Sequence, residues 1–537
     1  MSDPSTAATP KPQPQPGPGP QPGPSRPTAG DPFRVPGQPA WGPRPAPKPL
    51  WEQATEPPKP AAPALRVPAA GLAAGLLSAA VLSDGIGVNL LLCALAAAVV
   101  AGLAVRQTGR RVRPWTLLWA GLTIVLLAVP ALSDAGWPTC LAVVMAVALG
   151  SLALHGGARW TGVLLGSLGI WGHLVAAPRW VVSGLLGRQY PARARVVSLL
   201  KASAVAVGLL VVFGGLFASA DSGMASLLGG LLPSADLSDL PLRGLTFLLG
   251  LLVALAAAHA VAAPRRWDRF PVKAGRPRGR LEWAVPLAAL NLLFGVFVVE
   301  QVLVLFGGYE AVMSKPGILP AEYARQGFWQ LLWVTVLTLG VVALARRWAP
   351  RATAGDRLLV KGLLGLLGTL TLGVVASALY RMLRYMDNFG LTRLRLSVAA
   401  LELWLGVVFL LVIVGGVLTS QRWLPRAVML SAAVAVGAFG LVGPDRLIAE
   451  QNVAHFQKTG HLDVAYLQGL SADAVPALQR LPDSYRDCTL LVIDRDLGNR
   501  TSPWYATSLA ASRARQILRD HPVGPDADWE CARLGQP

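Results

Sequence analysis

The segment from Ser397 to Leu418 reads SVAALELWLGVVFLLVIVGGVL and contains one ionisable side chain, that of Glu402. A helix needs about 20 consecutive apolar residues to cross the ~30 Å hydrocarbon core of a bilayer, and this segment has that length. A helix that is apolar on every face is buried in a large core or in a membrane. The segment therefore predicts a membrane-spanning helix.

The rest of the chain is also rich in apolar residues and poor in charged ones. Of its 537 residues, 53% are hydrophobic and only 14% are charged, whereas soluble domains have about 25% charged residues. The net charge of +19 would suggest a nucleic-acid partner in a soluble protein. Here the basic residues lie between apolar stretches, where they orient a chain in the membrane, so we expect the lipid bilayer as a partner and no nucleic acid.

Comparable apolar segments recur from residue 66 to residue 443, separated by short polar breaks. We count about eleven: 68–83, 87–105, 115–132, 137–154, 197–219, 243–262, 283–306, 328–345, 358–380, 397–418 and 425–442. The first is short and rich in Ala and Gly, so its crossing stays open. The predicted fold class is all-α, a polytopic transmembrane helical bundle over residues 66–443.

The polar breaks alternate in charge along the chain. One class is rich in arginine, as at residues 106–113, 265–280 and 346–351, and the other carries acidic residues such as Asp84 and Asp134. The positive-inside rule makes the first class cytoplasmic. We therefore predict a multi-pass protein of the inner, or plasma, membrane with a cytoplasmic N-terminus and an extracytoplasmic C-terminus.

Residues 160–177 are also apolar enough to span. A crossing there would invert every later loop, so we assign them to an interfacial or half-inserted helix. The alternative, a further crossing, stays open.

The two ends of the chain differ from the bundle. Residues 1–65 are dominated by Pro, Gly and Gln and have no apolar period, which predicts a disordered Pro-rich cytoplasmic tail. That tail is either a solvated tether or a docking segment for a cytoplasmic partner. Residues 444–537 have mixed charge and helix start signals, which predict a small extracytoplasmic α-helical domain. Cys488 and Cys531 lie there, either as a disulfide or as free thiols.

The segment between the ninth and tenth predicted spans does not follow the positive-inside rule. By parity the segment from Tyr380 to Arg395 is extracytoplasmic, yet it carries four arginines. Glu300 and Glu402 lie inside neighbouring spans, each roughly 10 Å below the same surface at 1.5 Å per residue. Carboxylates at that depth cost about 2.5 kcal/mol or more unless they are paired or hydrated.

We therefore consider an outward-facing polar cavity whose arginines bind an anionic lipid or solute. Its candidate ligand-binding residues are Glu300, Glu322, Arg325, Arg381, Arg384, Asp387, Arg393, Arg395 and Glu402. The alternative is a structural ion-pair network that stabilises the bundle.

Three runs of sequence resemble a known family. They are Phe217–Asp221 (FASAD), Glu322–Leu331 (EYARQGFWQL) and Tyr385–Arg395 (YMDNFGLTRLR). With these runs the chain resembles the bacterial membrane family called domain of unknown function 4173, which is related to the 4153 group, and its composition is similar to that of actinobacterial members. The resemblance covers about residues 70–470. It implies a membrane protein and no assigned activity, cofactor or catalytic residue.

The sequence contains no Walker-type phosphate loop, no dinucleotide fingerprint, no nucleophile elbow and no Cys/His pairs at zinc spacing. We therefore expect no cofactor, no metal and no catalytic residues. The leading interpretation is a non-enzymatic envelope scaffold or sensor with a pocket for an anionic ligand. A secondary transporter of a small anionic solute or lipid, with Glu300 and Glu402 as proton-linked groups, is the first alternative, and an enzyme acting on envelope lipid is the second.

Overall fold

The computed structural model describes residues 56–186, 239–270, 279–306, 320–348, 353–418, 422–500 and 502–534, and the isolated positions 202, 206, 209 and 213. The side chains of residues 304–306, 320–328, 388 and 530 are not included. All described residues belong to one compact unit, Leu50–Pro537. Most of the predicted Pro-rich tail, and the predicted fifth span at 197–219 apart from the isolated positions, lie outside the described residues.

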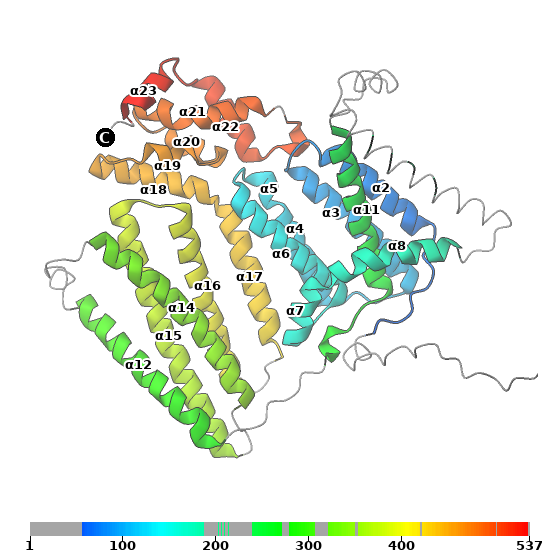
Figure 1. The fold of residues 1–537 in the computed structure, drawn as a ribbon, viewed down its shortest axis with the longest axis horizontal. Coiled ribbons are helices and arrows are strands. Elements are labelled where there is room, and N and C mark those ends of the chain that lie inside the picture. The colour runs from blue at the N-terminus through cyan, green and yellow to red at the C-terminus, as the bar shows by residue number, and fades with distance from the viewer. Residues whose placement is uncertain are drawn as a thin grey trace, which may run out of the picture. The chain divides into compact units, whose positions relative to one another are not determined.

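The described residues form helices and no strands, so the all-α prediction is confirmed (Figure 1). Nine helical segments in this part of the chain are long and apolar enough to cross a membrane, which confirms the polytopic class. They are α3 (Val88–Thr108), α4 and α5 together (Pro114–Leu127 and Val129–Leu132), α6 (Gly136–His155), α11 (Leu240–Ala262), α12 (Arg280–Phe306), α14 (Pro320–Trp348), α15 (Ala354–Phe389), α16 (Arg393–Val417) and α17 (Leu424–Val442).

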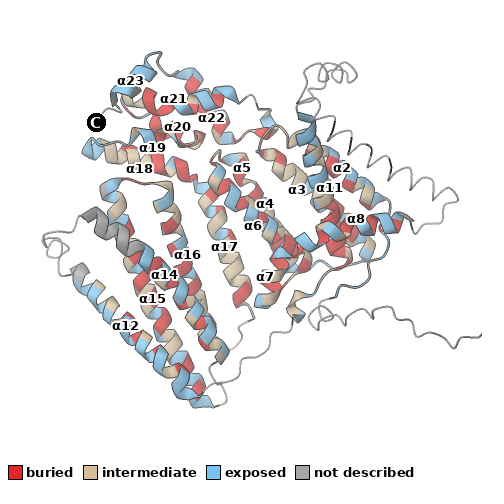
Figure 2. Ribbon diagram, in the orientation of Figure 1, coloured by how far each residue is buried: buried red, intermediate tan, exposed pale blue. Residues whose placement is uncertain are grey.

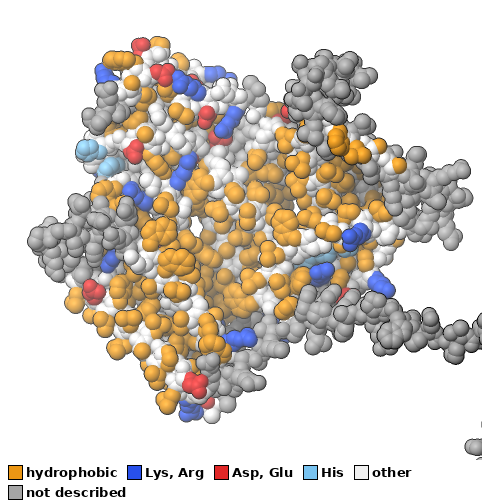
Figure 3. Space-filling view, in the orientation of Figure 1, with side chains coloured by type: hydrophobic (Ala, Val, Ile, Leu, Met, Phe, Trp, Pro, Cys, Tyr) orange, Lys and Arg blue, Asp and Glu red, His pale blue; other side chains and the backbone are white. Residues whose placement is uncertain are grey.

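The first predicted span corresponds to α2 (Arg66–Val81), an apolar helix of 16 residues. It packs against α11, where an added Cβ at Gly75 would lie only 3.1 Å from the side chains of Phe247 and Leu251. Small residues permit this close approach of two helices, which dispersion attraction favours inside a membrane. Buried positions face neighbouring helices (Figure 2), and hydrophobic side chains cover most of the visible face of the spans (Figure 3).

Residues 160–186 form two helices instead of one. α7 (Trp160–Leu168) and α8 (Ile170–Leu186) meet at 53° across Gly169, a geometry shared by a broken span and a re-entrant loop. The hydroxyl of Ser151 on α6 donates to Gly166 O at 2.6 Å and accepts from Ile170 N at 3.0 Å. Backbone groups freed by a helix break inside a membrane need such partners. The interfacial placement of residues 160–177 stays a prediction.

The two predicted classes of loop lie at opposite ends of the helices. The acidic turns at Asp84 and Asp134 and the turn at 390–392 all contact the C-terminal helices, through Tyr505, Asp473 and Asn452 respectively. At the other end, Arg426 donates to Gly157 O at 2.6 Å and Asp268 accepts from the backbone N–H groups of residues 158 and 159. The arginine-rich turn before α16 therefore shares an end with the acidic turns.

The C-terminal region is a group of short helices with its own core (Figure 1). They are α18 (Pro444–Thr459), α19 (Val464–Gln468), η3 (Ala472–Ala474), α20 (Val475–Leu478), α21 (Asp483–Asn499), η4 (Trp504–Ala506), α22 (Leu509–Asp520) and α23 (Ala527–Leu534). Ile448, Leu478 and Leu490 are fully buried in this core.

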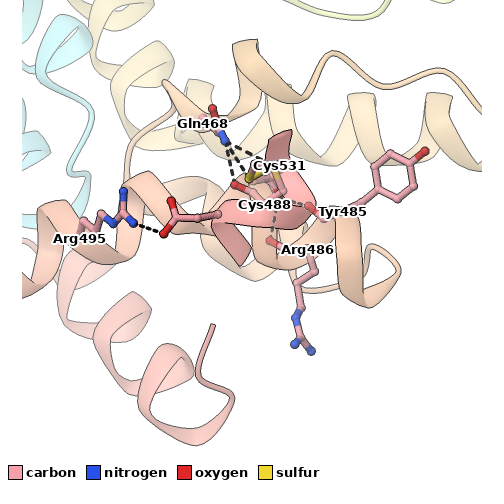
Figure 4. The surroundings of a disulfide bond; sticks show 8 residues. Gln468, Tyr485, Arg486, Cys488, Arg495 and Cys531 are labelled. Atoms are coloured by element: carbon pink, nitrogen blue, oxygen red, sulfur yellow. Dashed lines mark hydrogen bonds and ion pairs between the residues drawn. A yellow bond between two sulfur atoms is a disulfide. The ribbon is translucent and has the colours of Figure 1, made fainter. Parts of the chain in front are cut away.

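A disulfide between Cys488 and Cys531 joins α21 to α23, and Gln468 donates to Cys488 O at 3.0 Å beside it (Figure 4). The two cysteines are 43 residues apart in the chain. Closing a loop of this size in the unfolded chain stabilises the folded state by about 4 kcal/mol in the chain-entropy model. This contribution is large for a region whose core is built from short helices.

Candidate functional site

An ion pair between the helical bundle and the C-terminal helices lies at the centre of the candidate site. Arg393, in the first turn of α16, donates to Asp445 Oδ1 from Nε at 2.9 Å and to Oδ2 from Nη2 at 2.5 Å. The Asp445 side chain is fully buried, and that of Arg393 is 38% exposed. A bidentate guanidinium–carboxylate pair fixes the relative orientation of the two side chains and also neutralises their charges. The pair therefore joins the start of α16 to the start of α18.

Local sequence explains why Asp445 lies there. Gly443 has φ +69°, a conformation that glycine adopts without strain, and Pro444 then begins α18. Asp445 is thus in the first helical turn, where the helix dipole favours a negative charge. Its carboxylate also accepts from Ser471 N at 2.9 Å and from Trp137 Nε1 at 3.2 Å. Burial alone would raise the pKa of Asp445, but the hydrogen bonds from Arg393 and Ser471 outweigh it and lower this pKa below its ordinary value.

A second carboxylate connects the α5–α6 turn to the same C-terminal segment. One oxygen of Asp473 accepts from the N–H groups of Asp134 at 2.8 Å and Ala135 at 3.0 Å, and from the hydroxyls of Ser133 and Ser471. Burial raises the pKa of Asp473 despite these donors. Burial also raises the pKa of Asp134, whose carboxylate lies 3.7 Å from Arg500 Nη1. These two carboxyl groups therefore favour their protonated forms more than an exposed aspartate does.

A polar cavity of about 210 Å³ lies beside both carboxylate networks. It opens to the surface of the molecule and lies between the bundle and the C-terminal helices. The charged residues that line it are Asp134, Arg393, Asp496 and Arg500. The remaining lining residues are Gly136, Gly469, Leu470, Ser471, Ala472, Ile493 and Leu497. The two arginines among the lining residues can bind an anionic group such as a phosphate or a carboxylate, beside the two carboxyl groups.

The arginines of the 380–395 segment have separate partners. Arg381 donates to Gln301 at 2.6 Å, and Arg384 donates to the Tyr380 hydroxyl at 3.1 Å with its guanidinium 5.4 Å from that ring. Arg395 donates to the carbonyls of residues 389 and 390, at the end of α15, and lies 4.3 Å from the Tyr385 ring. Of the predicted arginines with described side chains, Arg393 is the one that lines the cavity.

The predicted acidic residues do not converge on this cavity. Glu300 is exposed on α12 and Asp387 is exposed near the end of α15. Glu402 is fully buried in α16, and its Oε1 lies 3.0 Å from Thr335 Oγ1. The side chains of Glu322 and Arg325, in the first turns of α14, lie outside the described residues. Their part in ligand binding stays a prediction.

Sequence reasoning missed several members of this site, among them Asp445, Asp473 and Arg500. Asp134 entered only as a marker of topology. A usable signal was present for Asp445. This carboxylate directly follows Gly443-Pro444 at the end of the last span, so it is placed at a helix N-terminus and near the turns at the same end of the bundle. No sequence signal connects Asp473 with Asp134, which is 339 residues away.

Residues 120–481 match the family model described as "Domain of unknown function (DUF4153)". The match spans more than half of the chain, so the chain belongs to this family of membrane proteins without an assigned function. It includes Asp134, Arg393, Asp445 and Asp473 and ends before Arg500. The 4153 group is the one to which the resembled 4173 family is related, and the narrower placement in the 4173 family stays a prediction. Neither a curated protein nor a solved structure matches the chain.

Proposed function

We propose that this protein is a non-enzymatic sensor or scaffold of the bacterial envelope that binds an anionic group in the cavity between its bundle and its C-terminal helices. In this proposal the protein lies in the inner membrane, with the cavity and the C-terminal helices outside and the Pro-rich tail in the cytoplasm. The ligand carries a phosphate or carboxylate, either as a lipid headgroup or as a free solute. The narrower family placement in the 4173 group belongs to the same proposal.

The observation that carries the proposal is the double role of Arg393. Arg393 is one of the residues that line the cavity, and its guanidinium forms the ion pair with Asp445. An anion bound in the cavity therefore acts on the same group that joins α16 to α18. Since a ligand shifts an equilibrium only through a difference in affinity between two states, a contact shared by ligand and interface is what a sensor requires.

Arg500, the second arginine of the cavity, is better suited than Arg393 to a test by substitution. Arg500 lies at the end of α21, its side chain is 56% exposed, and its described acidic neighbour, Asp134, is 3.7 Å away. Removing its charge leaves Asp134 without this partner, but burial raises the pKa of Asp134 and favours its neutral form, so the fold should tolerate Arg500→Gln. Arg495 on the same helix provides a matched control, because it is equally exposed and pairs with Asp528 away from the cavity.

The experiment measures binding of two probes to the full chain in nanodiscs. Inorganic phosphate tests a free anion, and discs containing phosphatidylglycerol compared with phosphatidylcholine test a lipid headgroup. We expect Arg500→Gln to weaken binding of one probe by roughly 10-fold or more, as the loss of a charged hydrogen bond of about 1.5–3 kcal/mol implies. Arg495→Gln should bind like the wild type. Equal affinity in both variants, or no binding of either probe, would contradict the proposal.

A second candidate function, secondary transport, is favoured by one observation on Glu402. Its Oε2 is buried and has no hydrogen-bond partner within the described part of the chain. Intramembrane carboxyl groups are frequent members of proton-coupled pathways. The discriminating measurement is uptake of a labelled anion by vesicles with and without a pH gradient. Uptake that Glu402→Gln abolishes would select transport, and binding without flux would select the sensor.

A further inference from the structure

Three histidines from three helices form a continuous hydrogen-bonded row at the opposite end of the bundle from the cavity. His155 Nε2 lies 3.0 Å from His173 Nε2, and His173 Nδ1 lies 2.8 Å from His259 Nδ1. They come from α6, α8 and α11, and 104 residues separate the first from the last in the chain. We call His155, His173 and His259 the histidine row.

The histidine row is buried. The exposed fractions are 9% for His155, 2% for His173 and 7% for His259. An added Cβ at Gly169, the break between α7 and α8, would overlap the His155 ring. On the other side, the Trp180 ring centroid is 5.3 Å from that of His259. The helix break and the packing of α8 therefore fix the order of the three rings.

One end of the row determines where its protons lie. His155 Nδ1 is 2.8 Å from Ser151 O, and a carbonyl can only accept, so Nδ1 carries the proton. A neutral imidazole has one N–H, which leaves His155 Nε2 as an acceptor for His173 Nε2–H. By the same count His173 Nδ1 accepts from His259 Nδ1–H. The Nε2 of His259 is then a bare nitrogen, and it makes no hydrogen bond within the described part of the chain.

Two charged groups face the histidine row. Arg265, three residues after the end of α11, acts electrostatically on all three histidines, and Arg110, after α3, acts on His155. Among the described residues, no other charged side chain acts on the three rings. Both neighbours are positive, so they oppose the uptake of protons, and a second positive charge in the row is strongly disfavoured.

From this geometry we propose that the histidine row is a proton-binding relay that takes up one proton through His259 and shares it among three rings. The proton adds to Nε2 of His259. As that N–H bond forms, His259 releases its Nδ1 proton to His173 Nδ1, and His173 releases its Nε2 proton to His155 Nε2. His155 then bears the charge, and every hydrogen bond of the row is kept with its direction reversed at the two inner positions.

The proton balance limits the row to one added proton. A second would place two N–H groups face to face at one of the inner contacts, where no acceptor remains. The relay therefore differs from a purely structural row, whose rings would stay in fixed tautomers at every pH. It also differs from a metal site, in which two ring nitrogens would bind the same ion.

The test is ¹⁵N NMR of histidine-labelled full chain in nanodiscs, titrated from about pH 8 to about pH 3. This range extends below the one in which ordinary histidines titrate, because burial and Arg265 oppose protonation of the row. His455, His461 and His521 are replaced by Gln so that only the row contributes signals. We expect Nδ1–H tautomers for His155 and His259 and the Nε2–H tautomer for His173 at the high-pH end. On acidification we expect the three rings to change together, with one proton taken up per chain.

Two variants make the outcome specific. His173→Asn breaks the relay but can still form hydrogen bonds, and it should make His155 and His259 titrate independently. Arg265→Gln removes the opposing charge and should shift the common midpoint to higher pH. If His173→Asn does not fold, the tautomers of the wild-type histidines across the titration test the proposal without it. Three independent titrations in the wild type, no titration at all, or a metal ion bound to the purified chain through these rings would overturn the proposal.

Discussion

Arg393 and Asp445, 52 residues apart in the chain, are joined by two hydrogen bonds between the first turns of α16 and α18. The pair neutralises the charge of an arginine whose turn lies at the same end of the bundle as the acidic turns at Asp84 and Asp134. The charge is neutralised by the segment that follows the last span. The C-terminal helices therefore supply the counter-charge for an arginine of the bundle.

The first prediction concerns this pair. Asp445→Asn should lower the free energy of unfolding by about 2 kcal/mol, a value between those of buried and exposed ion pairs because Arg393 is partly exposed. Thermal denaturation of the full chain in detergent micelles measures the loss. Glu450→Gln on the same helix is the control, because the exposed Arg446–Glu450 pair should contribute less than about 0.5 kcal/mol. Equal effects of the two substitutions would contradict the assignment.

The second prediction is a stability maximum at mildly acidic pH. The pKa values of Asp134 and Asp473 are raised by burial, so the stability linked to them is present below their unfolded pKa of about 3.9 and is lost as pH rises through the folded values. The pKa of Asp445 is lowered, so its contribution is present above about 3.9 and is lost as pH falls through the folded value.

A series of melting temperatures against pH checks this prediction. The wild type should gain stability as pH falls through the raised folded pKa values of Asp134 and Asp473, and lose it on further acidification. Asp445→Asn should flatten the limb below about pH 3.9, and Asp473→Asn should flatten the limb above it. A wild-type curve that falls steadily from neutral pH would show that the raised pKa values do not control stability.

The third prediction concerns Glu402. Thr335 Oγ1 lies 2.9 Å from Leu331 O and 3.0 Å from Glu402 Oε1, but a hydroxyl has one hydrogen. A carboxylic acid that donates to Thr335 satisfies both contacts, and so does the amide of glutamine. Glu402→Gln should therefore change stability by less than about 0.5 kcal/mol, whereas Glu402→Ala should cost about 2 kcal/mol through a cavity and a lost hydrogen bond.

Denaturation of both variants, with Glu300→Gln on the exposed face of α12 as the control, measures the difference. A large loss of stability in Glu402→Gln would mean that the side chain is ionised and paired. Such a result would remove the argument for a neutral carboxyl group.

The fourth prediction concerns the disulfide. Replacing Cys488 and Cys531 by Ser should destabilise the C-terminal helices by about 3–4 kcal/mol in the chain-entropy model. Limited proteolysis should then cut between residues 444 and 534 before the bundle. The matched control replaces Cys93 and Cys140, which are free thiols, and should leave the digestion pattern unchanged. Early cleavage within the bundle would show that the disulfide stabilises more than its own region.

The membrane class and the order of the spans could be predicted because apolar length and flanking arginines are properties of short stretches of sequence. α16 agrees within a few residues with the predicted 397–418 segment. The break at Gly169 was not predicted, because it depends on Ser151 of another helix to satisfy the freed backbone groups. The partner of Arg393 was missed for the same reason, since two helices far apart in the chain had to meet first.

Sequence alone determined that this chain spans a membrane many times, since each span must satisfy its own backbone and offer apolar side chains to lipid regardless of its neighbours. Only the tertiary structure decided which polar groups meet. Asp445 with Arg393, and His155 with His173 and His259, are brought together by helix packing. A hydrogen bond or ion pair acts over about 3 Å, so its partners follow from the packing of whole helices and not from any local pattern of residues.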